Sequence, residues 1–459
     1  MKNIKIYIFL CLWLASMGCD DNLDLAPVSQ LGQNSFYNTE DDYTAAINAA
    51  YSSLRSSGQF GDIVLFGDIR SDNTVPVLSG SVTTRTDFDE FSLNAANPRI
   101  QSTWQNTYNG IARTNGILVR IDEATIDEAF KNLVKGEALF LRGLMYFNLV
   151  RIYGDVPLVL NEISPEEAFQ VGQNDANDIY TQIISDLTAA ASLLPAIHSD
   201  DIGRATNIAA NALLGRVYLT LGDFPQTVTT LRKVTAQSPS IVNLLSNYAD
   251  VFDIANEYNQ EIIFAVRWTN DGQNGNGFNF GFANVNEPDN KATPDVYDEY
   301  ETGDLRRDLT WDATISTADT ILVKYGFAPA GQGESDWPVI RYADVLLMLS
   351  EALNEEGYVS NGEAFDLLNQ IRARAGLGSL TSVEVPDQAA FRLAIEHERR
   401  MELAGEGHRW FDLVRTGRFM DVMNGKGFNV EPRHRVFPIP QREIDNVNDP
   451  TILSQNTGY

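Results

Sequence analysis

Residues 396–418 read EHERRMELAGEGHRWFDLVRTGR, and this stretch is the most charge-dense part of the sequence. Its first half is a predicted helix that places Glu398 and Glu402 four residues apart, on one helical face. Two carboxylates at this spacing repel each other unless cations lie near them. Three arginines are close enough in sequence to neutralise these carboxylates: Arg399, Arg400 and Arg409. We therefore predict a partly buried ion network here.

The second half of the stretch predicts a packing element. Gly405 and Gly407 interrupt the helix, and an apolar cluster follows them. A second short helix can dock through this cluster while the arginines satisfy the carboxylates. The cluster consists of Trp410, Phe411, Leu413 and Val414. Residues 396–398 (EHE) suggest a metal site, but adjacent helical residues point in different directions, which favours an ion-paired or solvated face.

Helical periodicity recurs over much of the remaining chain. Apolar residues repeat at helical spacing in eight blocks, at 34–54, 101–115, 133–153, 178–194, 206–221, 342–356, 362–375 and 388–404. The block at 206–221 ends in Gly222 and Asp223, after which a helix resumes, and this rhythm is typical of tetratricopeptide repeats. We predict a mainly α fold, with a tetratricopeptide-like scaffold of about eight helices in four pairs whose neighbours bury each other's apolar faces.

Two loop-rich segments interrupt the helical blocks, at about 56–99 and 240–338. The first is rich in Gly, Pro, Ser, Thr and Asp. Within the second, 261–268 (EIIFAVRW) is a predicted strand, and 304–311 is expected to pair with 320–327 as a small hairpin. Loops of this length are usually functional or disordered.

The first residues are predicted to be an export signal. Residues 1–18 combine two lysines, an apolar run and small residues before Cys19, which is the layout of a secretory signal peptide. The run is too short to span a bilayer stably. The residues that end at Cys19 are similar to a bacterial lipobox, so we expect lipidation there, with plain secretion as the alternative. A lipidated tether, 19–33, then precedes one domain, 34–459.

The composition limits the classes of partner. With 459 residues, 44% of them hydrophobic, the chain can bury a sizeable core. Its formal net charge of −28 makes nucleic acid an unfavourable partner, because nucleic-acid binding depends on a basic surface. The same charge disfavours long polyanionic glycans, unless a local basic patch or bridging calcium offsets it. Neutral sugars meet no such barrier.

Catalytic motifs are missing from the sequence. The four histidines do not form HExxH, and the chain has no Walker loop, GxSxG elbow or CxxC pair. With 62 acidic residues, two carboxylates at glycosidase spacing are expected somewhere by chance, so such a pair would carry no information. We predict a protein that is not an enzyme and needs no cofactor, with a structural calcium ion left open.

Aromatic side chains in the second loop-rich segment are candidates for sugar binding. The face of an indole ring stacks on the apolar C–H face of a pyranose. The candidates are Trp268, Trp311, Trp337, Phe278 and Phe280. The alternative is that these rings pack inside the small sheet or fill the loops, and the sequence leaves both interpretations open.

Several segments together resemble the SusD/RagB family of surface glycan-binding lipoproteins. The resemblance rests on ERRMELAGEGHRWFDLVR at 398–415 together with FPIPQREID and the terminal SQNTGY. It extends to the following further segments: RYADVLLMLSEALN at 341–354, IRARAG at 371–376, ALFLRGLMYFNLVRIYGDVPL at 138–158 and LDLAPVSQ at 23–30. Sharp motifs are missing mainly between 240 and 337.

The resemblance implies a lipid-anchored protein on the outer face of the outer membrane of a Bacteroidetes-type bacterium. Such a protein captures an oligosaccharide and passes it to a TonB-dependent transporter of the SusC type. In the family, the binding face combines the middle insertion with the early loop. That loop would supply hydroxyl partners from Asp72, Asn73 and Arg85, although Asp72 and Asn73 are equally typical of turns. A peptide-capturing relative and a secreted glycoside hydrolase are the alternative functions.

Overall fold

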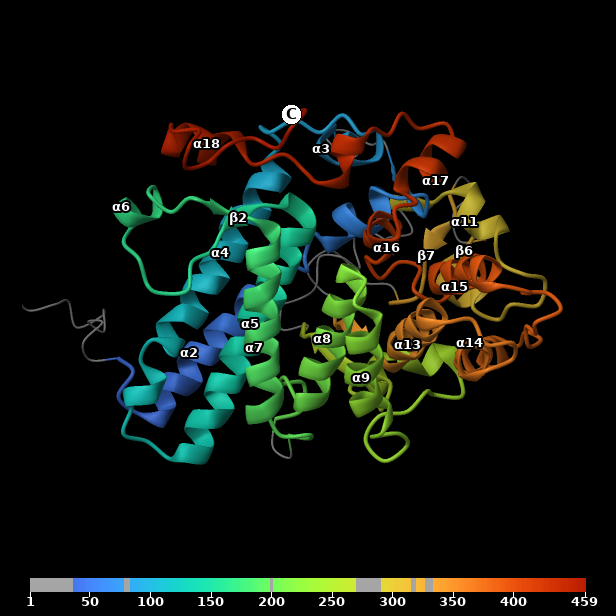
Figure 1. Ribbon diagram of the computed structural model, residues 1–459, viewed down its shortest axis with the longest axis horizontal. Coiled ribbons are helices and arrows are strands. Elements are labelled where there is room, and N and C mark those ends of the chain that lie inside the picture. The colour runs from blue at the N-terminus through green and yellow to red at the C-terminus, as the bar shows by residue number, and fades with distance from the viewer. Residues whose placement is uncertain (1–35, 78–82, 199–200, 270–289, 315–318, 327–332) are drawn as a thin grey trace, which may run out of the picture.

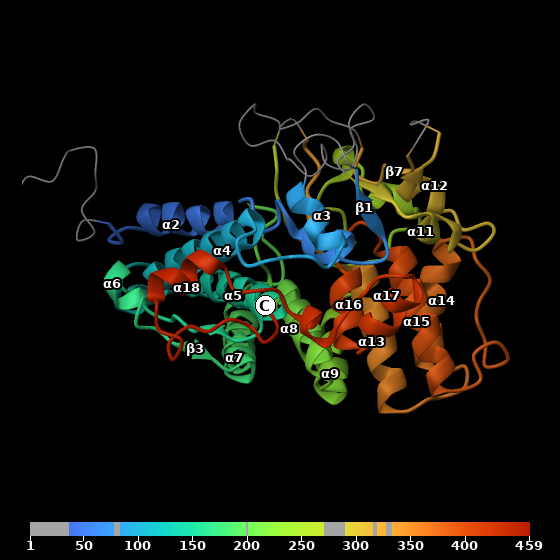
Figure 2. The same cartoon turned by 90° about the horizontal axis from the view of Figure 1, so that it is seen from above.

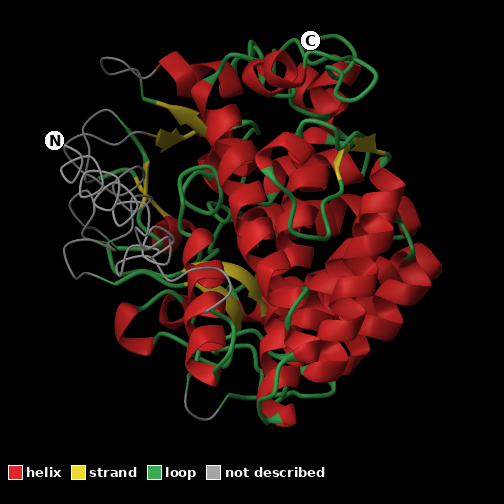
Figure 3. Ribbon diagram, turned by 90° about the vertical axis from the view of Figure 1, so that its left-hand side faces the viewer, coloured by secondary structure: helices red, strands yellow, loops and turns green. Residues whose placement is uncertain are grey.

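The computed structural model describes residues 36–77, 83–198, 201–269, 290–314, 319–326 and 333–459. Long helices dominate this part of the chain and form its scaffold (Figures 1 and 3). They are α2 (Glu40–Ser53), α4 (Pro98–Leu118), α5 (Glu128–Tyr153), α7 (Ala176–Leu193), α8 (Asn207–Leu221), α9 (Phe224–Thr235), α13 (Tyr342–Glu356), α14 (Glu363–Arg374) and α15 (Gln388–Glu402). The mainly α prediction is confirmed, and each predicted block corresponds to one of these helices.

The helices pack as successive pairs. Helix α2 lies against α4, α5 against α7, α8 against α9, and α13 against α14 and α15 (Figure 1). Neighbouring pairs also touch, because α4 packs on α5 and α7 on α8. Helix α9 packs directly on α13 although the whole middle region separates them in sequence. The scaffold is therefore continuous in space, as expected for a solenoid whose pairs bury each other's apolar faces.

Local sequence explains where the helices begin and end. The side chain of Asp127 caps α5 by accepting hydrogen bonds from the amides of Ala129 and Phe130. Helix α8 ends at Gly222, whose φ of 74° suits glycine. The next residue, Asp223, caps α9 by accepting from the amide of Gln226. One glycine and one aspartate thus make the sharp turn that the sequence predicted.

Short elements connect the scaffold. The short helices are η3 (Leu65–Ile69), α3 (Thr83–Asp89), η4 (Ile121–Glu123), α6 (Pro165–Ala168), η5 (Tyr248–Val251), η6 (Ile254–Asn256), α11 (Pro294–Asp298), α12 (Arg307–Thr310), α16 (Arg409–Arg415), α17 (Phe419–Gly425), η7 (Pro432–Arg435) and α18 (Gln441–Val447). The strands are β1 (Thr74–Pro76), β2 (Val156–Pro157), β3 (Gln173–Asn174), β4 (Ile262–Val266), β5 (Asn290–Ala292), β6 (Trp311–Asp312), β7 (Ile321–Leu322) and β8 (Trp337–Arg341). They form antiparallel pairs, β1 with β5, β2 with β3, β4 with β8 and β6 with β7.

Most of the strands lie on one side of the scaffold. Figure 2 shows β1, β7, α3, α11 and α12 together on the side opposite the ends of α9, α13 and α14. We call this side the loop face. The predicted strand at 261–268 is confirmed as β4, and the predicted hairpin is confirmed by the pairing of β6 with β7. The residues before Trp311 are helical, as α12, rather than extended. Pairing of β1 with β5 joins the early loop to the middle region.

Candidate functional site

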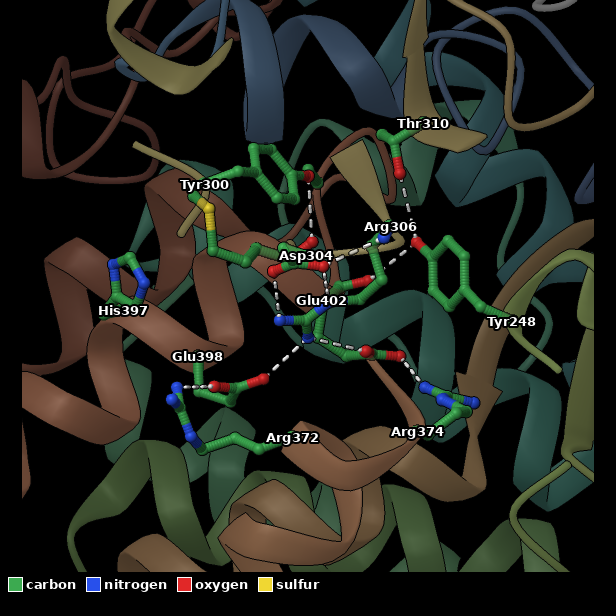
Figure 4. A network of polar contacts seen from close by, with 12 residues as sticks. Tyr248, Tyr300, Asp304, Arg306, Thr310, Arg372, Arg374, His397, Glu398 and Glu402 are labelled. Atoms are coloured by element: carbon green, nitrogen blue, oxygen red, sulfur yellow. Dashed lines mark hydrogen bonds and ion pairs between the residues drawn. The ribbon is translucent and has the colours of Figure 1, made fainter. Parts of the chain in front are cut away.

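A buried ion network lies beneath the loop face, centred on Glu402 at the end of α15 (Figure 4). One carboxylate oxygen of Glu402 accepts from Arg341 at 2.5 Å and from Arg374, and the other accepts from Arg306 at 3.0 Å. Glu398, one turn earlier, accepts from Arg306 at 2.6 Å and from Arg372 at 3.2 Å. The predicted network is confirmed in kind, because these side chains are almost fully buried.

The predicted partners of the two glutamates are wrong. Arg399 pairs with Asp344 and Asp412, so it faces α13 and α16 instead. The remaining predicted arginines pair as follows: Arg400 with Asp72 and Asp295, and Arg409 with Asp72 and Glu396. Adjacent residues on a helix point in different directions, so Arg399 and Arg400 cannot share the face of Glu398. The actual partners come from α14, β8 and the loop before α12.

The network is a structural device. Burial opposes the ionisation of Glu402, but the charges of Arg374, Arg341 and Arg306 outweigh it and hold the pKa of this carboxyl well below its usual range. The network joins the middle region to α14 and α15, because Glu261 before β4 also accepts from Arg341 and Arg374. Glu402 is fully buried, so no substrate can reach it in this arrangement.

Two of the early-loop residues predicted to bind ligand are buried as well. Asp72 accepts from Arg409 at 2.7 and 3.0 Å, and it is 1% exposed. Asn73 donates to Asp68 at 3.2 Å and accepts from Arg400 at 3.0 Å. These contacts fix the early loop on α15 and α16, which corrects the expectation of hydroxyl partners at the surface. Arg85 lies half-buried on α3 and interacts within the protein.

The three tryptophans of the middle region are also inside. Trp311 and Trp337 are each 1% exposed, and Trp268 is 6% exposed. The ring of Trp337 stacks on Tyr325, with a centroid distance of 5.7 Å. Burial leaves no indole face for a pyranose ring, so the prediction of an exposed platform at these residues does not hold. Strands β4 and β8 pair with each other and both contact α8, and the position of these residues beside a loop in the sequence could not reveal this. Phe278, Phe280 and Cys19 lie outside the described residues.

Polar side chains line two shallow hollows that flank Ala265 on β4. The larger hollow, of about 180 Å³, is bordered by the end of α2, residues 201–204 and residues 265–267. The smaller hollow, of about 30 Å³, is bordered by residues near Tyr258 and by Asp336. We call the polar groups around them the β4 rim. The rim consists of Arg55, Asp201, Tyr258, Arg267 and Asp336.

The β4 rim is held together from several directions. The guanidinium of Arg267 lies over the ring of Tyr258, 4.8 Å from its centroid, and donates to the carbonyl of Ile202 at 3.2 Å. Gly203 makes this close packing possible, because a Cβ there would lie 2.9 Å from Tyr258 and 3.0 Å from Arg267. Arg204 donates to Asp201 at 2.5 Å and to the buried Glu137 at 3.0 Å. These two contacts fix the loop at residues 201–204 on the scaffold.

Electrostatics within the rim are mixed. Asp336 accepts from the backbone amide of Trp268 at 2.8 Å, and burial raises the pKa of its carboxyl. Burial, together with the charge of Asp336, raises the pKa of Glu257 to about 7. Two guanidinium groups, carboxylates and a phenol supply both donors and acceptors, which is the set that sugar hydroxyls require. The sequence analysis did not select Tyr258 or Arg267 as binding residues, although Tyr258 lies just before the predicted strand at 261–268 and Arg267 lies within it.

In the ranges that the structure describes, no three His, Cys, Asp or Glu side chains are grouped so that they could hold a metal ion. Over the same ranges, no helix combines the length and the apolar character that crossing a membrane requires.

Comparison with family models gives two matches. A model described as the SusD family matches residues 327–459. A second, described as starch-binding associating with outer membrane, matches residues 21–219. The two matches lie on either side of the middle region, where the sequence also lacked sharp motifs.

Whole-chain relatives agree with these matches. SusD-like protein P25 of Formosa agariphila is 29% identical, and the alignment covers 100% of this chain and 99% of the relative. Among solved structures, a laminarin binding SusD-like protein is 31% identical, with a TM-score of 0.80, over 92% of this chain and 100% of the other. Surface glycan-binding protein A from Bacteroides thetaiotaomicron, in complex with laminarihexaose, shares the fold at 22% identity, with a TM-score of 0.79, over 91% of this chain and 100% of the other.

Proposed function

Because this chain belongs to the SusD/RagB family, we propose that it captures an oligosaccharide at the cell surface and delivers it to a SusC-like, TonB-dependent transporter in the outer membrane. The observation that carries the proposal is the similarity, over nearly the whole chain, to a protein named for binding laminarin. The 31% identical structure and the family description matched by residues 21–219 are named for binding rather than for catalysis, which agrees with the missing catalytic motifs.

A neutral glucan is the ligand class that we propose. Laminarin is the ligand in the name of the 31% identical structure. The net charge of −28 repels long polyanions but leaves neutral sugars unaffected. An open surface site of this kind gives affinities in the micromolar to millimolar range, about −8 to −4 kcal/mol.

The β4 rim is the proposed contact surface. It lies where β4 ends, within the middle region that the family resemblance implies is part of the binding face, and its donors and acceptors are partly exposed. Arg267 is the proposed principal donor, since its side chain is about half exposed and the carboxylate of Asp201 is as far as 3.9 Å away. Asp201 is the proposed acceptor for a sugar hydroxyl.

A matched pair of variants tests the rim. Arg267→Ala should weaken binding of laminarihexaose by about five- to a hundredfold, the effect of losing 1–3 kcal/mol at a contact residue. Arg307→Ala is the control, because Arg307 also lies over a tyrosine, Tyr297, at 5.1 Å, but away from the rim. Calorimetric titration measures both variants. Equal affinity in the two would place the sugar elsewhere, and no binding of any neutral glycan on an array would contradict the proposed function itself.

We further propose that Cys19 carries a lipid anchor. A lipidated cysteine with several acyl chains buries enough CH₂ groups, at roughly 0.8 kcal/mol each, to hold the protein on a membrane. Cys19→Ala should therefore move the protein from the membrane fraction to the soluble fraction. The fractionation is made in cells that lack the partner transporter, and retention of the variant in their membranes would contradict lipidation.

A further inference from the structure

A cleft of about 480 Å³ lies on the helical side of the molecule, away from the β4 rim. It is bordered by the end of α5, the start of α7, the end of α8 and helix α16. We call it the helical cleft. Arginines are unusually frequent in its lining for an acidic protein: Arg151, Arg216, Arg399, Arg415 and Arg435.

Arg151 forms no ion pair with a carboxylate in the part of the chain that the structure describes, although the charge of Asp412 acts on it from a greater distance. Its guanidinium carbon lies over the rings of Phe147 and Phe411, at 4.0 and 4.3 Å from the ring centroids. It donates to the carbonyl of Phe147 at 3.2 Å and to Asn148 at 2.6 Å. Within the described ranges it forms no ion pair, and its Nη1 has no hydrogen-bond partner. Burial and the charge of Arg216 lower the pKa of Arg151 to about 9, so it remains cationic at neutral pH.

Two more arginines of the cleft have unused donors. Arg216 is 7% exposed, and its Nε lacks a hydrogen-bond partner, although its other nitrogens bind Asp344 and the carbonyl of Val339. Arg435 is exposed, and no ion pair or hydrogen bond engages its guanidinium in the part of the chain that is described. A buried cationic donor normally has a partner, because leaving it unsatisfied is costly, and of these two arginines only Arg216 has a buried donor without one.

The acidic groups of the cleft are already engaged. Asp155 and Asp175 each accept from a backbone amide at the start of α7, at 2.9 and 2.8 Å. Asp412 is shared between Arg399 and Arg415. Among the described residues, three arginines of the cleft therefore pair with carboxylates, namely Arg216, Arg399 and Arg415, whereas Arg151 and Arg435 form no ion pair.

We propose that the helical cleft binds a small anionic ligand, through a carboxylate or sulfate group that Arg151 and Arg435 hold together. Guanidinium groups present paired donors that match the oxygens of such groups. The stacking on Phe147 and Phe411 keeps the fork of Arg151 in one orientation before the ligand arrives. The site is separate from the proposed neutral-glycan surface, so the two proposals stand or fall independently.

Sulfate and D-glucuronate are the probes, titrated calorimetrically into the protein at constant ionic strength with chloride as the reference anion. Saturable binding of either probe is expected. Arg435→Gln and Arg151→Gln should each weaken it about tenfold or more, the usual loss for one hydrogen bond to a charged group. Tighter binding of glucuronate would identify a sugar acid as the ligand, and binding of sulfate alone would identify an inorganic or esterified sulfate.

Arg232→Gln is the control, because Arg232 lies on α9 and pairs with Glu363 at the exposed surface. Its affinity for the probes should equal that of the unmodified protein. Arg435 is exposed, so its variant should fold even if Arg151→Gln does not. Absence of saturable binding of both probes, or an affinity unchanged in Arg435→Gln, would overturn the proposal. Binding of laminarihexaose should be the same in all four proteins.

Discussion

The same residue type serves different purposes in this chain, depending on its burial. Glu402 is fully buried and accepts from three arginines, whereas Glu363 pairs with Arg232 at the surface, where each side chain is about half exposed. Salt bridges exposed to water contribute little, while removing one member of a buried network leaves the other charges uncompensated. Position therefore decides how much each glutamate contributes to stability.

Glu402→Ala should lower the free energy of unfolding by roughly 3–5 kcal/mol, because Arg306, Arg341 and Arg374 would lose a shared carboxylate in the core. Glu363→Ala is the control and should change it by less than about 1 kcal/mol. Denaturant melts of both variants provide the measurement. A midpoint for Glu402→Ala that equals the unmodified one would show that the network is not needed for stability.

Trp337→Ala should behave as a core substitution. Its ring is 1% exposed and stacks on Tyr325, so truncation should cost about 3–5 kcal/mol of stability. The affinity for glycan per folded molecule should change little, since no face of the ring reaches the surface. A thermal melt beside a titration separates the two effects. An unchanged melting temperature together with a loss of glycan binding would show that Trp337 contacts the ligand.

At the scale of elements, the early loop docks by close backbone contact. Helix η3 lies against the turn at 405–407, where Asp68 accepts from the amides of Gly407 at 2.6 Å and Gly405 at 3.3 Å. A Cβ on Gly67 would lie 2.1 Å from the carbonyl oxygen of Gly407. Side chains cannot move aside here, because the obstacle is backbone. The absence of a side chain at Gly67 therefore allows η3 to pack directly against the backbone of the 405–407 turn.

Gly67→Ala should destabilise the protein by about 3 kcal/mol, since the added methyl must push η3 away from the 405–407 turn. Gly425→Ala is the control, because a Cβ at Gly425 would have no heavy atom within 4 Å. Urea melts should show the control within about 0.5 kcal/mol of the unmodified protein. Equal midpoints for the two variants would mean that η3 does not pack this closely.

At the scale of the whole molecule, buried carboxyls set the dependence of stability on pH. In the first group of carboxyls, burial raises the pKa. It reaches about 6 for Asp68 and about 7 for Asp89 and Glu137. Protonation of these side chains favours the folded state, so they add stability as pH falls from about 8 toward 4. In the other group, neighbouring arginines outweigh burial and hold the pKa below its usual range. That group includes Asp72, Asp344, Glu402 and Asp412.

Stability should therefore pass through a maximum between about pH 4.5 and 6. The carboxyls with a lowered pKa contribute their stability above about pH 4, and it is lost progressively as pH falls below that value. Asp68→Asn should flatten the rise between about pH 7 and 5, because it removes one of the titrating groups. Urea melts from pH 3 to 8 measure both effects. A stability that increases steadily up to pH 8 would contradict the assigned shifts.

Much of the scaffold follows from the sequence alone, because its causes are local. Apolar spacing defines α2, α5 and α13, and Gly222 with Asp223 defines the turn between α8 and α9 without help from distant residues. The strand β4 and the hairpin of β6 and β7 were also predictable from short patterns. The existence of a buried ion network followed from two glutamates on one helical face beside an apolar cluster.

Tertiary structure alone determined which side chains contact each other. The partners of Glu402 are Arg306, Arg341 and Arg374, which lie 96, 61 and 28 residues away, so helical spacing could not select them. Burial of Trp337 depends on the segments that pack over β8. These segments are distant in sequence, so a short sequence window around Trp337 does not include them. The β4 rim and the helical cleft are each assembled from segments far apart in the chain. Their chemistry arises only when the packed scaffold brings those segments together.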